Sequence, residues 1–189
     1  MAVRTDLEPG LTALMRARRA VHPLLLDPSY WRDRLQTLSG DMLGVVWTPR
    51  PDLSGHGKET MEFRIRSHDG EQLWGLYSRP AWHSEPWQAI VRSVGPAARP
   101  TIDSKLIQDG TAEFVFQEPA GRRLADRVVD VIQICRLAME MTGIEGVEVH
   151  APVGETHSPA CDDDLLIAEQ LLNHRILPPL RRPSGRFVR

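Results

Sequence analysis

The clearest hydrophobic pattern in the chain is the alternation over residues 61–80, MEFRIRSHDGEQLWGLYSRP. Apolar and charged residues alternate from Met61 to Ile65, and this period of two predicts a strand with one buried face. Asp69 and Gly70 follow, and the Asp-Gly dipeptide predicts a tight turn because glycine tolerates a positive φ. The second half of the segment predicts the returning strand. Together the two halves are expected to form an antiparallel hairpin.

Strand and helix patterns alternate after the hairpin. Residues 87–96 form a nearly continuous apolar run that ends in Gly-Pro, which is typical of an interior strand. The next patterns predict a short helix, a strand, a long helix, a strand and a final helix, over residues 101–108, 110–119, 121–143, 146–152 and 161–174 in that order. This alternation predicts an α/β fold, in which a mixed and mostly parallel sheet is flanked by helices.

The long helix has the strongest periodicity. One face carries the apolar residues Leu124, Val128, Val131, Cys135, Ala138 and Met139. The polar residues Arg127, Asp130, Gln133 and Arg136 lie mostly elsewhere around it. Gly143 is expected to end the helix. The pattern predicts an amphipathic helix, with Cys135 as a buried apolar residue rather than a disulfide partner.

The pattern before the hairpin is helical rather than extended. Residues 6–43 predict two helices, interrupted at Pro23, and a Pro- and Gly-rich loop follows over residues 48–60. We therefore expect three parts: an N-terminal helical segment at 1–50, an α/β domain at 51–180 and a flexible Arg-rich tail at 181–189.

The composition is that of an ordinary soluble globular chain, with 41% hydrophobic and 25% charged residues. A net charge of −2 makes nucleic-acid binding an unfavoured function, because that binding needs a concentrated basic surface. The chain starts without an apolar signal segment, and no apolar run approaches the roughly 20 residues of a membrane helix. We expect a cytoplasmic protein without a membrane span, and no motif indicates a cofactor.

The hairpin and the strand after it resemble the entry to the α/β-hydrolase fold. The most similar proteins are the acetyl xylan esterase and cephalosporin deacetylase group and the prolyl-oligopeptidase-like domains. In them, a hairpin with this Asp-Gly turn precedes an apolar strand whose glycine loop helps to form the oxyanion hole. The matching residues here are Ser67, Asp69, Gly70, Leu73, Gly75, Pro80, Ile90, Val91 and Gly95. The likeness covers residues 60–152 and implies the N-terminal half of a hydrolase with a helical extension before it.

The chemistry departs from that family. The fold carries its serine on a G-x-S-x-G turn, where glycines let the backbone bend sharply. The sequence contains no G-x-S-x-G. After the strand at residues 146–152, the nearest serine is Ser158, and Pro159 after it lacks the amide hydrogen that an oxyanion hole needs. The family's acid and histidine lie on later strands, for which the sequence shows no counterpart. We therefore carry over no catalytic residue.

The segment after that strand still holds reactive side chains, namely His150, His157, Ser158 and Cys161. Histidine and cysteine can bind zinc, but the spacing matches no paired zinc motif, so no metal site is assigned. A thiol at a helix start can also act as a nucleophile, although three Asp residues follow Cys161 and oppose a thiolate. The alternative is an ordinary loop that caps the final helix.

Two further groups are candidates for binding. Gly121, Arg122 and Arg123 precede the long helix, where free amides and guanidinium groups can bind an anion, or where the arginines can pair with nearby acids. Trp82 and Trp87 lie in a Pro-containing loop, where large aromatic residues form either an interface or core packing under the loop.

These observations leave two functions open. The first is a non-catalytic hydrolase-like module that binds a partner protein or a small ligand. The alternative is an esterase-type hydrolase whose active site is non-standard or is completed in an oligomer. A shortened sheet leaves an open edge, so we also expect a homo-oligomer or another protein partner at that edge. Binding of nucleic acid through the Arg-rich tail is a weaker third idea.

Overall fold

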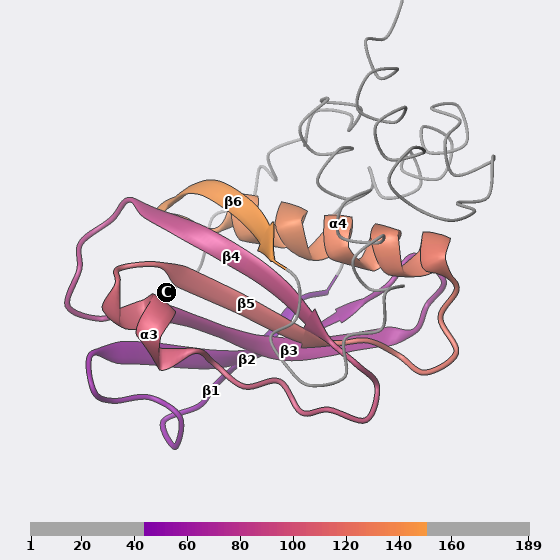
Figure 1. Ribbon diagram of the computed structural model, residues 1–189, viewed down its shortest axis with the longest axis horizontal. Coiled ribbons are helices and arrows are strands. Elements are labelled where there is room, and N and C mark those ends of the chain that lie inside the picture. Colours follow the sequence, from indigo (N-terminus) through magenta and orange to yellow (C-terminus); the bar gives the residue numbers. More distant parts are fainter. Residues whose placement is uncertain (1–43, 151–189) are drawn as a thin grey trace, which may run out of the picture. The chain divides into compact units, whose positions relative to one another are not determined.

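The computed structural model describes residues 44–150, which form one six-stranded sheet with a helix on each face (Figure 1). The strands are β1 (Val46–Pro49), β2 (Lys58–Arg66), β3 (Gln72–Pro80), β4 (Trp87–Val94), β5 (Ala112–Gln117) and β6 (Ile144–His150). The helices are α3 (Ser104–Gln108) and α4 (Leu124–Glu140). The described elements follow the expected order of hairpin, strand, short helix, strand, long helix and strand.

The strands lie side by side in the order β1-β2-β3-β5-β4-β6. The expectation of a mostly parallel sheet is wrong. Three neighbouring pairs are antiparallel, namely β1–β2, β2–β3 and β3–β5, whereas only β5–β4 and β4–β6 are parallel. The hairpin contributes one antiparallel pair as predicted, and its two outer edges each pair antiparallel with a further strand.

The predicted hairpin is confirmed residue by residue. Phe63 pairs with Gly75 and Ile65 pairs with Leu73 across β2 and β3. Gly70 has a φ of 89°, the left-handed conformation that the Asp-Gly turn requires. The side chains of Phe63, Ile65 and Leu73 are fully buried, as the alternation of apolar and polar residues predicts.

The strand β1 is an addition to the expected elements. It pairs with the outer edge of β2, and the Trp47 ring packs 5.8 Å from the Phe63 ring and 5.9 Å from the Tyr77 ring. Aromatic packing of this kind stabilises the curled edge of the sheet. The helices expected over residues 6–43 and 161–174, and the tail at 181–189, lie outside the described residues.

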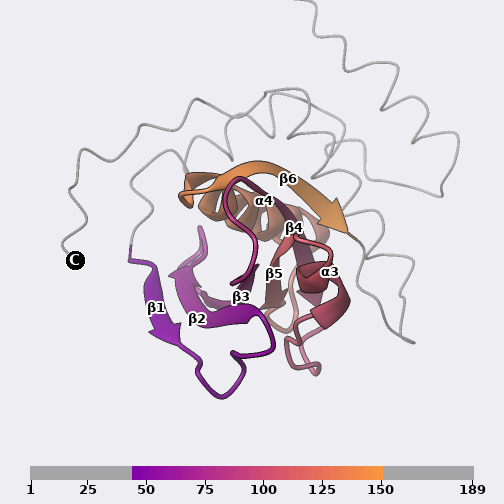
Figure 2. The same ribbon diagram turned by 90° about the vertical axis from the view of Figure 1, so that its left-hand side faces the viewer.

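The sheet curls around α4, and α3 lies on its outer face (Figure 2). The core residues on the α4 face are Phe63, Ile65, Leu73, Tyr77, Val91, Phe114 and Phe116. Residues on the opposite face include Leu76, Ile90 and Val115, with Ile107 of α3. Because both faces carry buried side chains, the strands show nearly continuous apolar runs.

Helix α4 is buried more completely than its amphipathic pattern predicts. Its polar residues Asp130, Gln133 and Arg136 are buried, whereas Met139 is 43% exposed. Gln133 donates from Nε2 to the Arg66 carbonyl oxygen at 2.6 Å, so this polar side of the helix faces the end of β2. Gln133 therefore has a partner inside the fold, and none of these three buried residues marks a solvent-facing surface.

The remaining sequence expectations concern thiols and membranes. Cys135 is buried with a free thiol, as predicted for a small apolar residue. Neither α3 nor α4 is both long and apolar enough to cross a membrane.

Candidate functional site

The carboxyl ends of β4 and β5 form a topological switch point. The chain leaves β4 through α3 on one face, and it leaves β5 through α4 on the other face (Figure 1). In open α/β sheets, ligands bind outside the carboxyl ends of strands at such a point. Strand β6 is parallel to β4 and ends at His150 on the same edge. This carboxyl edge is therefore the candidate location of a functional site.

The side chain of Gln117 fixes the loop that follows β4. Its Nε2 donates to the Pro96 carbonyl at 2.7 Å and to the Ala98 carbonyl at 2.8 Å. Its Oε1 accepts a 2.6 Å hydrogen bond from Trp74 Nε1. Gly95, which the hydrolase resemblance assigns to the oxyanion loop, directly precedes Pro96, and its carbonyl accepts from the Ala98 backbone nitrogen at 2.9 Å. The loop after β4 is thus attached to the ends of β3 and β5.

A group of polar side chains lies beside this edge, where the turn between β2 and β3 meets the start of α4. We call it the turn cluster, and its members are Ser67, His68, Asp69, Arg122, Asp126 and Asp130. Arg122 donates to both carboxylate oxygens of Asp69, and its Nε lies 3.1 Å from Asp130 Oδ2. The Ser67 hydroxyl donates to Asp130 Oδ1. The cluster therefore connects the turn to the helix through charged hydrogen bonds.

Three members of the turn cluster stand in the order of a hydrolytic triad. The Ser67 Oγ lies 3.1 Å from His68 Nδ1, and His68 Nε2 lies 3.3 Å from Asp126 Oδ1. In nucleophilic hydrolases, an imidazole in such a chain removes the serine proton. Here the single hydroxyl proton is donated to Asp130 instead, and Ser67 is only 5% exposed. The hydroxyl is neither directed to the imidazole nor open to a substrate.

Asp130 is the most strongly perturbed carboxyl of the turn cluster. Burial raises its pKa to about 7. The Ser67 hydrogen bond and the Arg122 charge oppose this rise, whereas the negative charges of Asp69 and Asp126 add to it. Asp130 thus exchanges a proton near neutral pH, although its carboxylate already has a hydroxyl and a guanidinium beside it.

Replacing Asp130 by asparagine is expected to flatten the pH dependence of stability. Because its pKa is raised in the folded state, the contribution of Asp130 to stability is complete below the ordinary aspartate pKa and is lost as pH rises toward 7. The free energy of unfolding of the wild type, relative to Asp130→Asn, should fall by on the order of 4 kcal/mol between about pH 4 and about pH 8. Urea denaturation of both proteins across this range measures the difference. A difference that stays constant or rises with pH would contradict the buried acid.

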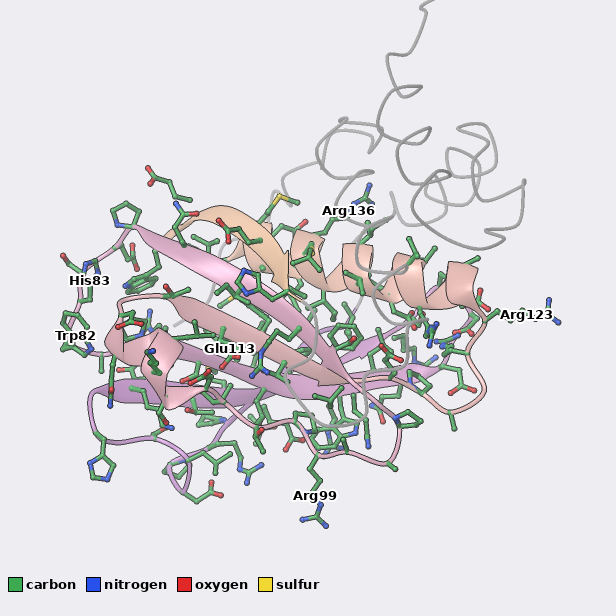
Figure 3. All side chains as sticks on the ribbon, viewed as in Figure 1. Trp82, His83, Arg99, Glu113, Arg123 and Arg136 are labelled. Carbon is green, nitrogen blue, oxygen red and sulfur yellow. The ribbon has the colours of Figure 1, made fainter. Side chains whose placement is uncertain are left out.

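The structure does not bring the two candidate anion-binding arginines together. Arg122 points into the turn cluster, where it pairs with Asp69 and Asp130. Arg123 occupies the N-cap position of α4, and its side chain projects outward from the end of the helix (Figure 3). Gly121 lies in the preceding loop with a φ of 75°. Anion binding at this segment stays a prediction, and Arg122 already has two carboxylates beside it.

The structure describes only one of the four residues in the predicted site loop. His150 is exposed at the end of β6, with its Nε2 3.2 Å from Glu148 Oε2. His157, Ser158 and Cys161 lie outside the described residues, so their convergence with His150 stays a prediction. Within residues 44–150, no group of three His, Cys, Asp or Glu side chains has the geometry to bind a metal ion.

The two loop tryptophans have different environments. Trp87 is 4% exposed, and its Nε1 donates to the His83 carbonyl oxygen at 3.0 Å. Trp82 is 56% exposed and stands beside His83 at one end of the described fold (Figure 3). Trp87 thus corresponds to the core-packing alternative, while an interface role for Trp82 stays a prediction.

Sequence reasoning did not identify Asp130 as a cluster residue, since it placed the polar positions of α4 mostly away from the apolar face and assigned them no partners. The spacing of two acidic residues in the helix was nevertheless a usable signal for this cluster. Asp126 and Asp130 are four residues apart, so they share one side of the helix. The resemblance had already marked Ser67 and Asp69, which lie opposite that side.

No family model matches the chain, and no curated protein matches its sequence. Solved structures do match. An acetyl xylan esterase from Paenibacillus sp. R4 is 13% identical with a TM-score of 0.54, over 75% of this chain and 56% of that one. Acetyl xylan esterase 1 from Thermoanaerobacterium sp. JW/SL YS485 is 16% identical with a TM-score of 0.53, over 67% of this chain and 50% of that one. The chain spans about half the length of these esterases and shares their α/β-hydrolase-like fold.

Proposed function

We propose that the chain is a hydrolase-fold module that binds a small ligand or a protein partner, including a second copy of itself, without cleaving esters. The observation that carries the proposal is the state of Ser67. Its hydroxyl is buried and donates to Asp130, although a histidine lies within hydrogen-bond distance. The sequence supports the same conclusion, since it lacks G-x-S-x-G and follows Ser158 with a proline.

An esterase-type hydrolase with a non-standard or oligomer-completed active site is the second candidate. Two observations favour it: the fold shared with the two acetyl xylan esterases, and the order of Ser67, His68 and Asp126. For this function, Ser67 would have to direct its proton to His68 and become accessible to an ester. Ser158 and Cys161 are the alternative nucleophiles.

Covalent labelling separates the two candidates. The full chain is incubated with a fluorophosphonate, which marks activated serines, and separately with iodoacetamide, and the intact mass is recorded. We expect no stoichiometric serine adduct, and we expect Cys161 to react no faster than a free cysteine, because a module that only binds needs no activated nucleophile. The same result is expected for Ser67→Ala and Ser158→Ala.

A stoichiometric adduct that disappears in one of these serine variants would overturn the non-catalytic proposal and would identify the nucleophile. Because Ser67→Ala removes the hydrogen bond to Asp130, its fold is checked by circular dichroism before labelling. An adduct that persists in both variants would direct the search to the remaining serines, and it would still contradict the proposal.

A further inference from the structure

His68 lies in the middle of the turn cluster, between Ser67 and helix α4. Its side chain is 12% exposed, its Nδ1 lies 3.1 Å from Ser67 Oγ, and its Nε2 lies 3.3 Å from Asp126 Oδ1. The charge of an imidazole depends on whether one or both of its ring nitrogens carry a proton. In this cluster the neighbouring groups determine both positions.

The hydrogen bond that Ser67 donates determines the proton on Nδ1. A serine hydroxyl has a single proton, and Ser67 donates it to Asp130 Oδ1. The Ser67 oxygen therefore presents only lone pairs to His68, so a hydrogen bond between them requires a proton on Nδ1. This requirement holds whether Asp130 is ionised or is protonated at its other oxygen, because Oδ1 accepts in both states.

The other ring nitrogen also faces an acceptor. Nε2 of His68 lies beside a carboxylate oxygen of Asp126, in the first turn of α4. A neutral imidazole carries a proton on one nitrogen only, so each neutral tautomer leaves one of the two contacts without a hydrogen. Only the doubly protonated imidazolium donates to Ser67 and to Asp126 at the same time.

The charges around His68 favour the same state. They come from three elements: Asp69 in the turn, Arg122 in the loop before α4, and Asp126 and Asp130 in α4. The carboxylates outnumber the guanidinium even when Asp130 is protonated, and Arg122 is paired with Asp69 and Asp130. An excess of nearby carboxylates favours the charged form of a histidine.

Two further contacts agree with a cationic His68. Arg127, the residue after Asp126, pairs with a carboxylate outside the turn cluster, since its Nη1 lies 3.8 Å from Glu118 Oε2. The pKa of Asp69 is lowered although burial opposes the shift; the hydrogen bond from a guanidinium is the main cause, and the His68 charge is a weaker one. The imidazolium and the carboxylates of the cluster therefore stabilise one another.

We propose that His68 is a pH-sensitive link between the turn and α4, which holds Ser67 and Asp126 as an imidazolium and is broken when the ring loses one proton. That proton passes from one ring nitrogen to solvent, and the nitrogen then faces an acceptor with no hydrogen between them. While both nitrogens are protonated, Nδ1 cannot accept the Ser67 proton, so His68 cannot activate the serine. The inference rests on the Ser67 hydrogen bond that also carries the proposed function.

Nuclear magnetic resonance of the full chain measures the charge of His68 directly. Proton–nitrogen correlation spectra of the histidine rings distinguish doubly protonated from neutral imidazoles, and the spectrum of His68→Gln identifies the His68 signals. We expect more than half of His68 to be doubly protonated at about pH 7.5, where an ordinary histidine is only about one-tenth protonated. A His68 ring that is mostly neutral at this pH overturns the proposal.

Asp126→Asn tests the contact with α4. It keeps the size of the side chain but removes the anion beside Nε2, so the doubly protonated fraction of His68 at about pH 7.5 should fall at least twofold. The matched control is Asp52→Asn, which removes a carboxylate at the opposite end of β2 and should leave the fraction unchanged. An unchanged fraction in Asp126→Asn overturns the link to α4.

The pH dependence of unfolding tests the loss of the link. Because the paired imidazolium keeps its proton to a higher pH than the unfolded chain does, its contribution to stability is complete below the ordinary histidine pKa and is lost as pH rises above it. The comparison is made between Asp130→Asn and the same variant with His68→Gln, because Asp130 also titrates near neutral pH. Asparagine keeps an oxygen that accepts the Ser67 proton.

Urea denaturation of these two proteins gives their unfolding equilibrium constants. The constant of Asp130→Asn, relative to the variant that also carries His68→Gln, should rise by about fivefold or more between about pH 6.5 and about pH 8.5. A ratio that does not change with pH overturns the proposal, even if the resonance spectra show an imidazolium.

The charge of His68 and the reactivity of Ser67 are measured separately, so the two proposals can fail separately. A neutral His68 without a fluorophosphonate adduct overturns the link and leaves the proposed function standing. An adduct that forms on Ser67 only above the pH at which His68 loses its proton supports the link, because the freed Nδ1 then accepts the serine proton, and it overturns the proposed function.

Discussion

Replacing Glu113 by alanine is expected to lower the free energy of unfolding by about 3–5 kcal/mol, because it leaves a buried arginine without its partner. Arg92 of β4 donates from Nε to Glu113 Oε1 at 2.6 Å, and both side chains are buried. The second carboxylate oxygen accepts from the Asp103 backbone nitrogen at 2.7 Å, next to the start of α3. The variant therefore loses the ion pair and one anchor of the loop before α3. Urea denaturation of the full chain measures the loss.

The control is a double variant in which Arg92→Met and Glu113→Leu replace the pair by apolar side chains. Removing both charges avoids the cost of an unpaired buried charge, so the double variant should be clearly more stable than Glu113→Ala. A double variant that is as unstable as Glu113→Ala would show that the charges themselves are not the cause. In that case the packing of this sheet face would explain the loss.

Replacing Gly75 by alanine is expected to destabilise the sheet by about 3 kcal/mol or more. An added Cβ would lie less than 3.0 Å from the Val115 carbonyl oxygen, from Phe63 Cζ and from Phe116 Cα. Two of these three atoms belong to the backbone of β5, which cannot move without breaking its pairing with β3. The expected result is a large fall in the urea midpoint, or a failure to fold at all.

Gly146→Ala is the matched control for Gly75→Ala. It adds the same methyl group to a strand glycine, but the added Cβ would meet the end of the Gln88 side chain, which can rotate away. We expect a loss of less than about 1 kcal/mol for this variant. If the two alanine variants lose equal stability, the close approach of β3 and β5 at Gly75 is not the cause.

Much of the fold could be predicted from the sequence because its signals are local. The alternation over residues 61–80 and the Asp69-Gly70 dipeptide specify the hairpin, and the apolar periodicity of residues 121–143 specifies α4. The direction of the pairing between β3 and β5 is not local, because thirty-odd residues and two further elements separate the two strands. The short edge strand at 46–49 likewise depends on a surface that only the folded hairpin provides.

The candidate site was predicted less well, for a physical reason. Polar residues on a helix predict exposure only when nothing polar lies opposite them. Asp130 and Gln133 are buried because the turn after β2 presents a hydroxyl to Asp130, and the last residue of β2 presents a carbonyl group to Gln133. The resemblance marked Ser67 and Asp69, but a resemblance cannot say whether a serine proton points to a histidine or to an aspartate.

Steady-state hydrolysis of short-chain 4-nitrophenyl esters by the full chain tests most directly whether this fold binds without cleaving. We predict a rate no higher than that of the same protein unfolded in urea and corrected for denaturant, and no change in Ser67→Ala or Ser158→Ala. Saturable turnover by the native protein that one of these serine variants abolishes would contradict the binding-module proposal. It would show instead that a hydrolase site is completed in this half-length sheet.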